Sequence, residues 1–351
     1  MSAPRPYVLI SPASADRADW LAARRGGIGS SDVAAILGVG SHGNAQAVYY
    51  DKTHALPVDD DAGEAALWGT LHEETIAREW ARRNRAVVRR IGLIARRDAD
   101  HHRCTLDRLV RECPQQRERG EICALEVKSR SAWLAGRWRR AVPDDVLAQT
   151  LWQLHVTGMD HVHVACLVGG NDYRQYIVRR GEHADLIADI VTAVDRFWTE
   201  HVLAQRVPAL TGDENADAVM DLYDQLHPDR SGIARLDGEK ALDAQLLITD
   251  YETHRIREGR AKKAKAAARV ALVELLGSAE AAALYDQPVA AYSLDTVNRD
   301  GDPLVRESVD LERLAEQFPD AYAACVKTTP YKRFTVARER RLKEDNVDVS
   351  A

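Results

Sequence analysis

One region in the first half of the chain, where strand patterns and a helix pattern follow one another closely, constrains the fold most. Residues 104–110 and 122–129 have the composition of two strands, and the polar residues 113–120 between them predict a β-hairpin. Residues 143–157 predict a helix that ends at a glycine. Residues 161–168 alternate between apolar and polar positions, which predicts a further strand. This part of the chain is therefore expected to be a mixed α/β structure.

A change in composition after this region suggests a second module. Residues 208–217 read as a linker, and the chain beyond them is rich in Ala, Lys and Arg. We expect a mixed α/β domain over residues 1–205 and a mostly helical module of unknown role over residues 206–351. The other predicted elements are helices over residues 64–84, 182–203 and 239–277 and strands over residues 173–178, 289–296 and 333–337.

Composition excludes several classes of protein. No apolar run approaches the ~20 residues that a membrane span needs, and residues 1–12 lack the pattern of a secretory signal. The five cysteines are scattered and odd in number, which favours reduced thiols in a cytoplasm over a disulfide framework. A formal net charge of −6 excludes a uniformly basic nucleic-acid binder but allows a local basic groove.

The sharpest chemical signal is the triplet Glu126-Val127-Lys128. Residues i and i+2 of a strand share a face, so Glu126 and Lys128 point the same way. Asp107 on the preceding strand and Glu73 on the earlier helix are able to approach them. Convergent carboxylates suit Mg²⁺, which polarises a phosphate and activates water. A solvent-facing ion pair is the plainer interpretation of the triplet, and spacing alone leaves both open.

Five blocks of sequence, in order, resemble a known family. Asp107 with Glu126-Val127-Lys128 is similar to the D…ExK core of the PD-(D/E)xK nucleases. The surrounding sequence resembles the YqaJ-like viral recombinase group, which includes the bacteriophage lambda type of 5′→3′ exonuclease. The resemblance covers about residues 17–180. The other four blocks are Trp20 through Arg24 to Gly27-Ile28-Gly29-Ser30-Ser31-Asp32, Asp51-Lys52-Thr53, Gly69-Thr70-Leu71-His72-Glu73, and Gln149 to Gly158.

This resemblance implies a fold and a metal site. The fold would be an α/β PD-(D/E)xK restriction-endonuclease-like core, with a mixed central sheet flanked by helices, followed by the mostly helical C-terminal module. Asp107, Glu126 and the main-chain carbonyl of Val127 would hold the metal. Lys128 would position the attacking water, and Glu73 would complete the site, at a possible second metal.

The same resemblance assigns further roles and exposes two departures. Gln149 would lie at the edge of the site, and Arg24 and Ser31 would grip a DNA 5′-phosphate. A guanidinium pairs bidentately with phosphate, which makes that role chemically reasonable. Arg108 follows the metal-binding aspartate where the family usually has glycine. Glu74 follows the helix glutamate where proline is frequent, and helix geometry is expected to let only one of these two glutamates face the site.

The activity implied is a Mg²⁺-dependent exonuclease, with Mn²⁺ able to substitute. It would digest linear double-stranded DNA from the 5′ end and leave 3′ single-stranded tails for phage-type recombination. The expected partners are double-stranded DNA and a RecT-type single-strand-annealing protein, and a ring trimer is expected by analogy, in the cytoplasm of a bacterial or phage-infected cell. Three alternatives stay open: a related endonuclease or other DNA-processing nuclease, an inactive DNA-binding accessory protein, and a structural protein that assembles through its Arg-rich helix.

The remaining cysteines and histidines are interpreted as non-ligating. Iron–sulfur nucleases of the same superfamily need a close cysteine cluster towards the C-terminus, where only Cys325 lies. We therefore expect no cluster at Cys104, Cys113 and Cys123. The pairs His101-His102 and His161-x-His163 are interpreted as surface and strand residues.

Overall fold

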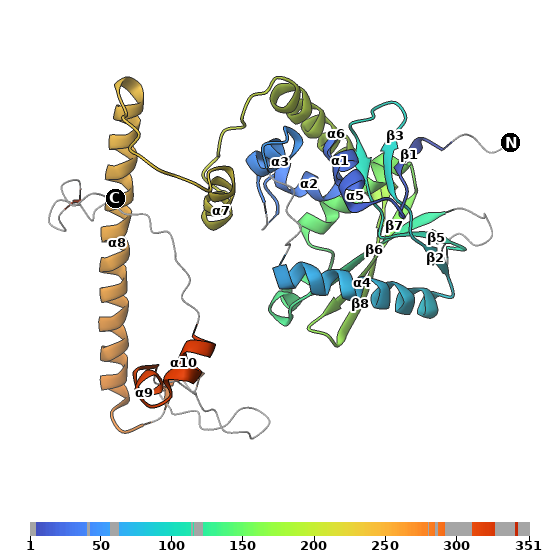
Figure 1. Cartoon of the computed structure of the whole chain (residues 1–351). Coiled ribbons are helices and arrows are strands. Elements are labelled where there is room, and N and C mark those ends of the chain that lie inside the picture. The colour runs from blue at the N-terminus through green and yellow to red at the C-terminus, as the bar shows by residue number, and fades with distance from the viewer. Residues whose placement is uncertain are drawn as a thin grey trace. The chain divides into compact units, whose positions relative to one another are not determined.

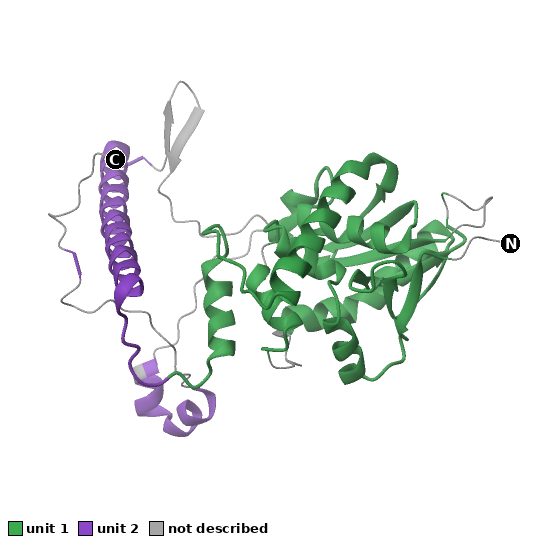
Figure 2. Cartoon of the chain, turned by 90° about the horizontal axis from the view of Figure 1, so that it is seen from above, with its two compact units in different colours: residues 1–230 green, residues 231–351 purple. Residues whose placement is uncertain are grey.

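The computed structural model divides into two compact units, residues 1–230 and 231–351 (Figures 1 and 2). Among the described residues no helix is both long and apolar enough to cross a membrane. The structure describes residues 5–40, 43–56, 63–113, 115, 122–279, 281–284, 287–291, 311–326 and 341–342.

The first unit is built around a five-stranded sheet. Its strands are β2 (Val87–Arg89), β5 (Arg108–Arg111), β6 (Cys123–Arg130), β7 (His161–Val168) and β8 (Asp172–Arg179). They lie in the order β2-β5-β6-β7-β8. Only the β6–β7 pair is parallel, because a helical crossover, α5 (Asp144–Thr157), connects these two strands. The central sheet is therefore mixed, as the fold class predicts.

Helices cover both faces of this sheet. Helix α4 (Gly63–Asn84) packs on β6 and β7 from one side, and α5 packs on β7 and β8 from the other (Figure 1). The second layer also contains α2 (Ser30–Ile36) and α6 (Ala184–Phe197), which pack against α5. The predicted fold class, a mixed central sheet flanked by helices, is confirmed.

Alternation along β6 separates the two faces chemically. Cys123, Leu125 and Val127 share one apolar cluster with Ile76 and Trp80 of α4. The side chains between them point the other way, towards α5, where the larger core cluster lies. This single strand therefore contributes to two different environments.

A small sheet and further helices complete the first unit. The strands β1, β3 and β4 form an antiparallel sheet in the order β1-β3-β4. Helix α6 continues into a π-helical segment, and a 3₁₀ segment follows β6. The elements are β1 (Tyr7–Ser11), β3 (Leu93–Arg96), β4 (Arg103–Cys104), α1 (Arg17–Arg25), α3 (Ala45–Lys52), the 3₁₀ segments Ala132–Trp138 and Arg180–Glu182, the π segment Trp198–Leu203, and α7 (Ala216–Leu226).

Helix α7 belongs to the first unit through contacts with α3. The Gln46 side chain donates to the Pro208 carbonyl at 2.8 Å and accepts from the Tyr223 hydroxyl at 3.2 Å. The first compact unit consequently ends at Arg230, whereas the sequence predicts a domain boundary between residues 205 and 206. That domain boundary stays a prediction.

The second unit is dominated by one long helix, α8 (Gly238–Leu276) (Figure 2). A strand pair, β9 (Ala281–Leu284) and β10 (Gln287–Ala291), and two short helices, α9 (Leu311–Gln317) and α10 (Pro319–Cys325), follow it. Its mostly helical character is as predicted. The strand predicted over 289–296 is described only as far as residue 291, and the one predicted over 333–337 lies outside the described residues.

Two sequence expectations are corrected. The strand expected over residues 104–110 is divided, because its first part, β4, pairs in the small sheet and its second part, β5, pairs in the central one. The surface position expected for His102 is wrong, since this residue is 3% exposed and hydrogen-bonded to Asp195 and His155.

Candidate active site

Glu126 lies at the centre of the candidate site and is 1% exposed on β6. Its Oε1 accepts hydrogen bonds from the Lys128 ammonium at 2.5 Å and from Gln149 Nε2 at 2.6 Å. Its Oε2 accepts one from Gln153 Nε2 at 2.7 Å. A buried charge is tolerated only when it is well hydrogen-bonded, and three donors achieve that here. Both oxygens of Glu126 are therefore held in a fixed orientation.

Gln149 connects two charged side chains of β6, Glu126 and Lys128. Its Oε1 accepts from Lys128 Nζ at 2.9 Å while its Nε2 donates to Glu126, which closes a triangle of hydrogen bonds. An amide is suited to this position because it offers an acceptor to the ammonium and a donor to the carboxylate. Gln153 lies one turn further along α5 and so projects from the same helix face.

Asp107 lies immediately before β5 and reaches β6 through its carboxylate. Its Oδ2 accepts a hydrogen bond from the Val127 amide at 2.7 Å. Burial raises the pKa of Asp107 well above its usual range, and the negative charges of Glu126 and Glu73 raise it further. Lys128 and the Val127 amide act in the opposite direction without cancelling that effect. Negative charge is thus in excess around Asp107.

Arg108, at the position where the family usually has glycine, holds both glutamates of α4. Its side chain is 3% exposed and donates to Glu73 and, at 2.7 Å, to Glu74 Oε2. Arg90 lies near the same carboxylates, 4.0 Å from Glu73 and 3.6 Å from Glu74. Both glutamates contact Arg108, although only Glu73 lines the cavity that contains Asp107.

A cavity of about 300 Å³ opens beside Asp107 and Glu73. Its wall includes the cationic side chains of Arg17 and Arg90 and the ring of Trp20. The guanidinium carbon of Arg17 lies 5.3 Å from the centroid of that ring, which is cation–π distance. Carboxylates, guanidinium groups and one aromatic face therefore meet in the same cavity.

Arg24 and Ser31 form a second cluster, at the start of α2. Arg24 Nη2 donates to Ser31 Oγ at 3.0 Å and to Asp32 Oδ1 at 2.8 Å. Asp32 Oδ2 accepts from the Gly29 amide at 2.9 Å and pairs with the buried Lys52 ammonium at 2.7 Å. Burial acts to raise the pKa of Asp32, but Lys52 and Arg24 outweigh it and the pKa is lowered.

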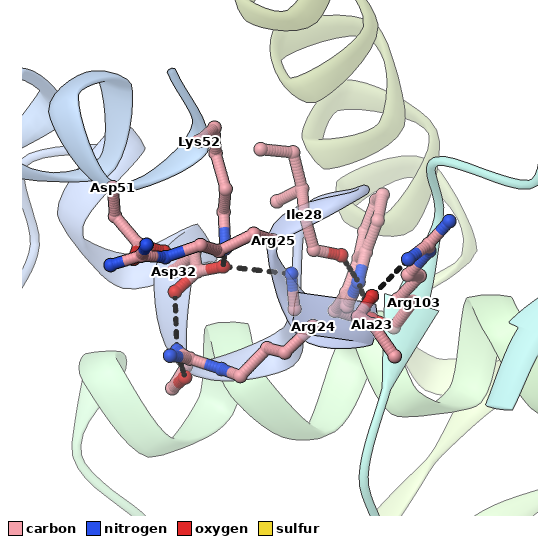
Figure 3. Close-up of polar contacts among 11 residues, drawn as sticks. Ala23, Arg24, Arg25, Ile28, Asp32, Asp51, Lys52 and Arg103 are labelled. Carbon is pink, nitrogen blue, oxygen red and sulfur yellow. Dashed lines mark hydrogen bonds and ion pairs between the residues drawn. The ribbon is translucent and has the colours of Figure 1, made fainter. Parts of the chain in front are cut away.

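Lys52 connects this cluster to the second block of the resemblance. It pairs with Asp51 at 3.1 Å as well as with Asp32, and Asp51 also binds Arg25 at 3.0 Å (Figure 3). The side chain of Lys52 is completely buried. The two N-terminal blocks, distant in the sequence, are therefore joined by an alternating chain of charges.

The residues predicted from the sequence fall into two groups. The structure brings Glu73, Asp107, Glu126, Lys128 and Gln149 into one neighbourhood, and it places Arg24 and Ser31 together in the second cluster. Sequence reasoning missed the contacts of three further residues. Spacing of four residues from Gln149 would have found Gln153, whereas nothing local to Arg108 or Arg17 indicates which carboxylate or cavity each one meets.

The donor set fits a hard divalent cation. Asp107 and Glu126 offer carboxylate oxygens. Val127, which follows Glu126 on β6 and whose amide donates to Asp107, offers a main-chain carbonyl. These are the ligand types that Mg²⁺ and Mn²⁺ prefer. Burial is the largest cause of the raised pKa of Asp107, and the negative charges of Glu126 and Glu73 add to it; a bound cation would offset the part that comes from these charges.

Together, the mixed sheet and the Asp107…Glu126-Val127-Lys128 arrangement define a PD-(D/E)xK-type α/β domain. Residues 19–160 match the family model of the YqaJ-like viral recombinase domain. The resemblance predicted from the sequence blocks is confirmed. The YqaJ protein of Bacillus subtilis (strain 168) is 28% identical over 344 residues, a match that covers 96% of this chain and 99% of the relative.

Among solved structures, the chain is similar to an alkaline exonuclease (LHK-Exo) from Laribacter hongkongensis, and also to the same protein in complex with dAMP. Each match has a TM-score of 0.44 and 20% sequence identity and covers 54% of this chain and 93% of the other.

Proposed function

We propose that the first unit is a divalent-metal-dependent deoxyribonuclease that digests linear double-stranded DNA as an exonuclease. The observation that carries this proposal is the closed hydrogen-bond triangle of Glu126, Lys128 and Gln149 beside the charge-crowded Asp107. Such an arrangement costs stability in a chain with no cation to bind. A divalent cation beside these groups would offset that cost, which supports a metal-dependent reaction at this site.

Asp107, Glu126 and the Val127 carbonyl would hold the metal, Mg²⁺ or its substitute Mn²⁺. When bound, the metal supplies a Lewis acid for the phosphate and a lower pKa for water. Glu73 would be a ligand of a second ion, and its ion pair with Arg108 limits how that ion binds. Because Glu73 is already paired with Arg108, an ion there must share the carboxylate with this guanidinium.

Lys128 would orient the attacking water and offset the negative charge that develops on the phosphate. Its ammonium is fixed by Glu126 and Gln149 and keeps 14% of its side-chain surface exposed, so it has a route to substrate. Gln149 acts as a positioning residue, since it holds the ammonium and the carboxylate in one geometry. The guanidinium groups of Arg17 and Arg90 would neutralise the DNA strand in the adjoining cavity.

Arg24 and Ser31 would bind the 5′-phosphate of the DNA end. Arg24 retains 27% of its side-chain surface, and Asp32 orients its guanidinium. A phosphate would accept from both the guanidinium and the hydroxyl. Digestion would then run 5′→3′ and leave 3′ single-stranded tails, the substrate of a RecT-type annealing protein in phage-type recombination. A ring trimer around the duplex, in the cytoplasm, belongs to the same proposal.

The test uses linear duplexes with 5′-phosphate or 5′-hydroxyl ends, each labelled on one strand, with Mg²⁺, Mn²⁺ or EDTA. We expect digestion with either metal, none in EDTA, release of label from the 5′ end first, and slower attack on the hydroxyl end. Lys128→Met should abolish the reaction, because methionine preserves volume without charge. Lys240→Met is the matched control, since Lys240 is exposed on α8.

Three results would contradict parts of this proposal. Equal cleavage of closed circular DNA identifies an endonuclease, because an exonuclease needs an end. Binding of duplex without metal-dependent loss of it identifies a DNA-binding accessory protein. Equal rates on both end groups remove Arg24 and Ser31 from substrate recognition.

A further inference from the structure

A third polar cluster lies on the α4 side of the central sheet, the face opposite Glu126 and Lys128. It takes no part in the proposed nuclease reaction. Cys113, Cys123, His161 and His163 are each buried, and one ligand atom from each lies within 4.8 Å of the others. Polar groups this deeply buried need partners. The parts of the chain that bring them together are far apart in sequence.

Sheet topology explains how the four residues meet. Cys113 follows the end of β5, and Cys123 begins β6, so the β5–β6 connection places both sulfur atoms at one end of the sheet. His161 and His163 are alternate residues at the start of β7, which runs parallel to β6 with His163 opposite Leu125. Both histidines therefore project from the same face as Cys123.

The distances match the edges of a coordination tetrahedron. Cys113 Sγ lies 3.1 Å from His161 Nε2 and 3.4 Å from His163 Nε2, and the two Nε2 atoms are 3.2 Å apart. In a tetrahedral zinc site, Zn–S and Zn–N bonds of about 2.3 and 2.05 Å give S···N and N···N edges of about 3.6 and 3.3 Å. Binding would require only a small outward adjustment of these atoms.

The orientation of the two imidazoles supports a shared ion. His161 Nδ1 lies 3.3 Å from Asp160 Oδ2, so this nitrogen donates its proton to the carboxylate. Its Nε2 lone pair is then directed into the cluster, and metal-ligating histidines commonly donate their other ring N–H to a carboxylate in this way. His163 points the same nitrogen inwards, and its ring packs on Trp80 with centroids 4.8 Å apart.

We propose that Cys113, Cys123, His161 and His163 bind one Zn²⁺ ion in a closed, structural Cys₂His₂ site. Two thiolates and two imidazoles in a tetrahedron are the donor set that zinc prefers. The site is closed because all four residues and the neighbouring Trp80 are buried, which leaves no position for substrate. The ion would tie the β5–β6 connection to β7 and so brace β6, whose opposite face contains Glu126 and Lys128.

This inference stands independently of the nuclease proposal, and its test measures metal rather than activity. The full chain is purified under reducing conditions without chelator, and its metals are measured by mass spectrometry. We expect about one zinc per chain. Replacement by Co²⁺ should give the visible d–d bands of tetrahedral cobalt and the near-ultraviolet absorption of thiolate–cobalt bonds.

Single substitutions locate the ion. Cys123→Ser and His163→Gln should each reduce the zinc content at least fivefold, whereas Cys166→Ser, a buried cysteine further along β7, should keep it. If a variant fails to fold, a thiol-specific mercurial applied to the wild-type protein gives the same information. It should release one zinc for every two buried thiols that react first.

Several outcomes would overturn the site. They are a freshly prepared wild-type chain with no zinc that also shows no cobalt spectrum, zinc that persists in Cys123→Ser, or zinc lost equally in Cys166→Ser. Iron with labile sulfide in place of zinc would overturn the identity of the ion and restore the iron–sulfur alternative.

Discussion

The two faces of β6 contain buried polar clusters of opposite character. Towards α5, Glu126 and Lys128 belong to a charged cluster that reaches a cavity through Asp107 and Glu73. Towards α4, Cys123 belongs to a closed cluster of sulfur and nitrogen donors behind Trp80. Catalytic metal sites keep an open position and structural ones do not. Under the two proposals above, one strand supports reaction on one face and stability on the other.

The largest expected effect is a loss of duplex digestion caused by a substitution on the charged face of β6. Glu126→Gln removes a ligand charge and leaves an amide facing the donors of Gln149 and Gln153. We expect the rate of duplex digestion to fall by roughly 10³-fold, the scale of losing a preorganised charge in an active site. Initial rates on 5′-phosphorylated duplex measure this. Glu182→Gln, on an exposed turn, is the matched control, and zinc content should be unchanged in both.

Retention of more than a tenth of the wild-type rate in Glu126→Gln would show that the carboxylate is not a metal ligand. Loss of zinc in the same variant would show that the two faces are not independent.

Removal of the structural ion should affect stability more than chemistry. We expect Cys123→Ser to lower the melting temperature by about 10 °C, equivalent to roughly 3–5 kcal/mol at 2–4 °C per kcal/mol. Zinc removal from the wild-type chain should produce a similar shift. Calorimetry measures both. Digestion at 20 °C, per folded molecule, should stay within about threefold, because the thiol contacts no residue of the charged face.

Cys166→Ser provides the comparison, and its shift should be less than half as large. An equal shift would mean that packing of any buried cysteine, rather than metal binding, explains the loss of stability.

A substitution of Arg108 tests the edge of the charged face, where guanidinium groups form ion pairs with the glutamates of α4. Arg108→Met removes the nearest, buried cation from Glu73 and Glu74, which leaves these partly exposed carboxylates only the longer ion pairs with exposed Arg90 and Arg78. We expect a loss of about 2 kcal/mol in the free energy of unfolding, less than for a fully buried pair because both glutamates retain solvent. Denaturant titration measures the loss.

Arg90→Met is the matched control, because Arg90 lies near the same glutamates with a side chain that is 61% exposed. We expect it to cost less than about 0.5 kcal/mol. Similar costs for the two variants would contradict the role given to the buried pairing of Arg108.

The smallest expected effect is a pH dependence on the α5 side. Burial lowers the pKa of His155 to about 4, and the neighbouring charges of His102 and Arg96 contribute. Because the folded pKa lies below the unfolded value of about 6.5, stability is complete above pH 6.5 and is lost as pH falls towards 4. His155→Gln should flatten this loss, by on the order of 1 kcal/mol at pH 5 once solvent screening of the partly exposed ring is taken into account. Thermal melts from pH 7 to 4.5 measure it, and an unchanged slope would exclude His155.

Local patterns predicted the parts of the fold that local physics controls. The helix expected over residues 64–84 is observed as Gly63–Asn84, and the one expected over 143–157 as Asp144–Thr157. The latter ends at Gly158, whose φ of +70° favours glycine. The short strands β1, β2 and β3 were missed, because three to five residues carry too little periodicity to be recognised.

The candidate site was predictable to the extent that one strand determines it. Alternation places Glu126 and Lys128 on one face whatever surrounds them. The preceding strand and helix suggested Asp107 and Glu73 as their neighbours, and the family resemblance added Gln149. The partners of Arg108 and Lys52 were not predictable, because each ion pair joins elements that only packing brings together. Only one of Glu73 and Glu74 was expected to face the site. Of the two, only Glu73 lines the cavity, but the length of the Arg108 side chain lets both glutamates reach its guanidinium.

The sequence alone determined the Glu126-Val127-Lys128 triplet, the alternation that separates the two faces of β6, and the boundaries of the long helices. Each of these depends on near neighbours along the chain. What only the tertiary structure decided is the convergence of Cys113 and Cys123 with His161 and His163. That convergence requires the parallel register of β6 and β7, which is fixed by a crossover helix and by the packing of both sheet faces. No spacing within the sequence encodes such a register.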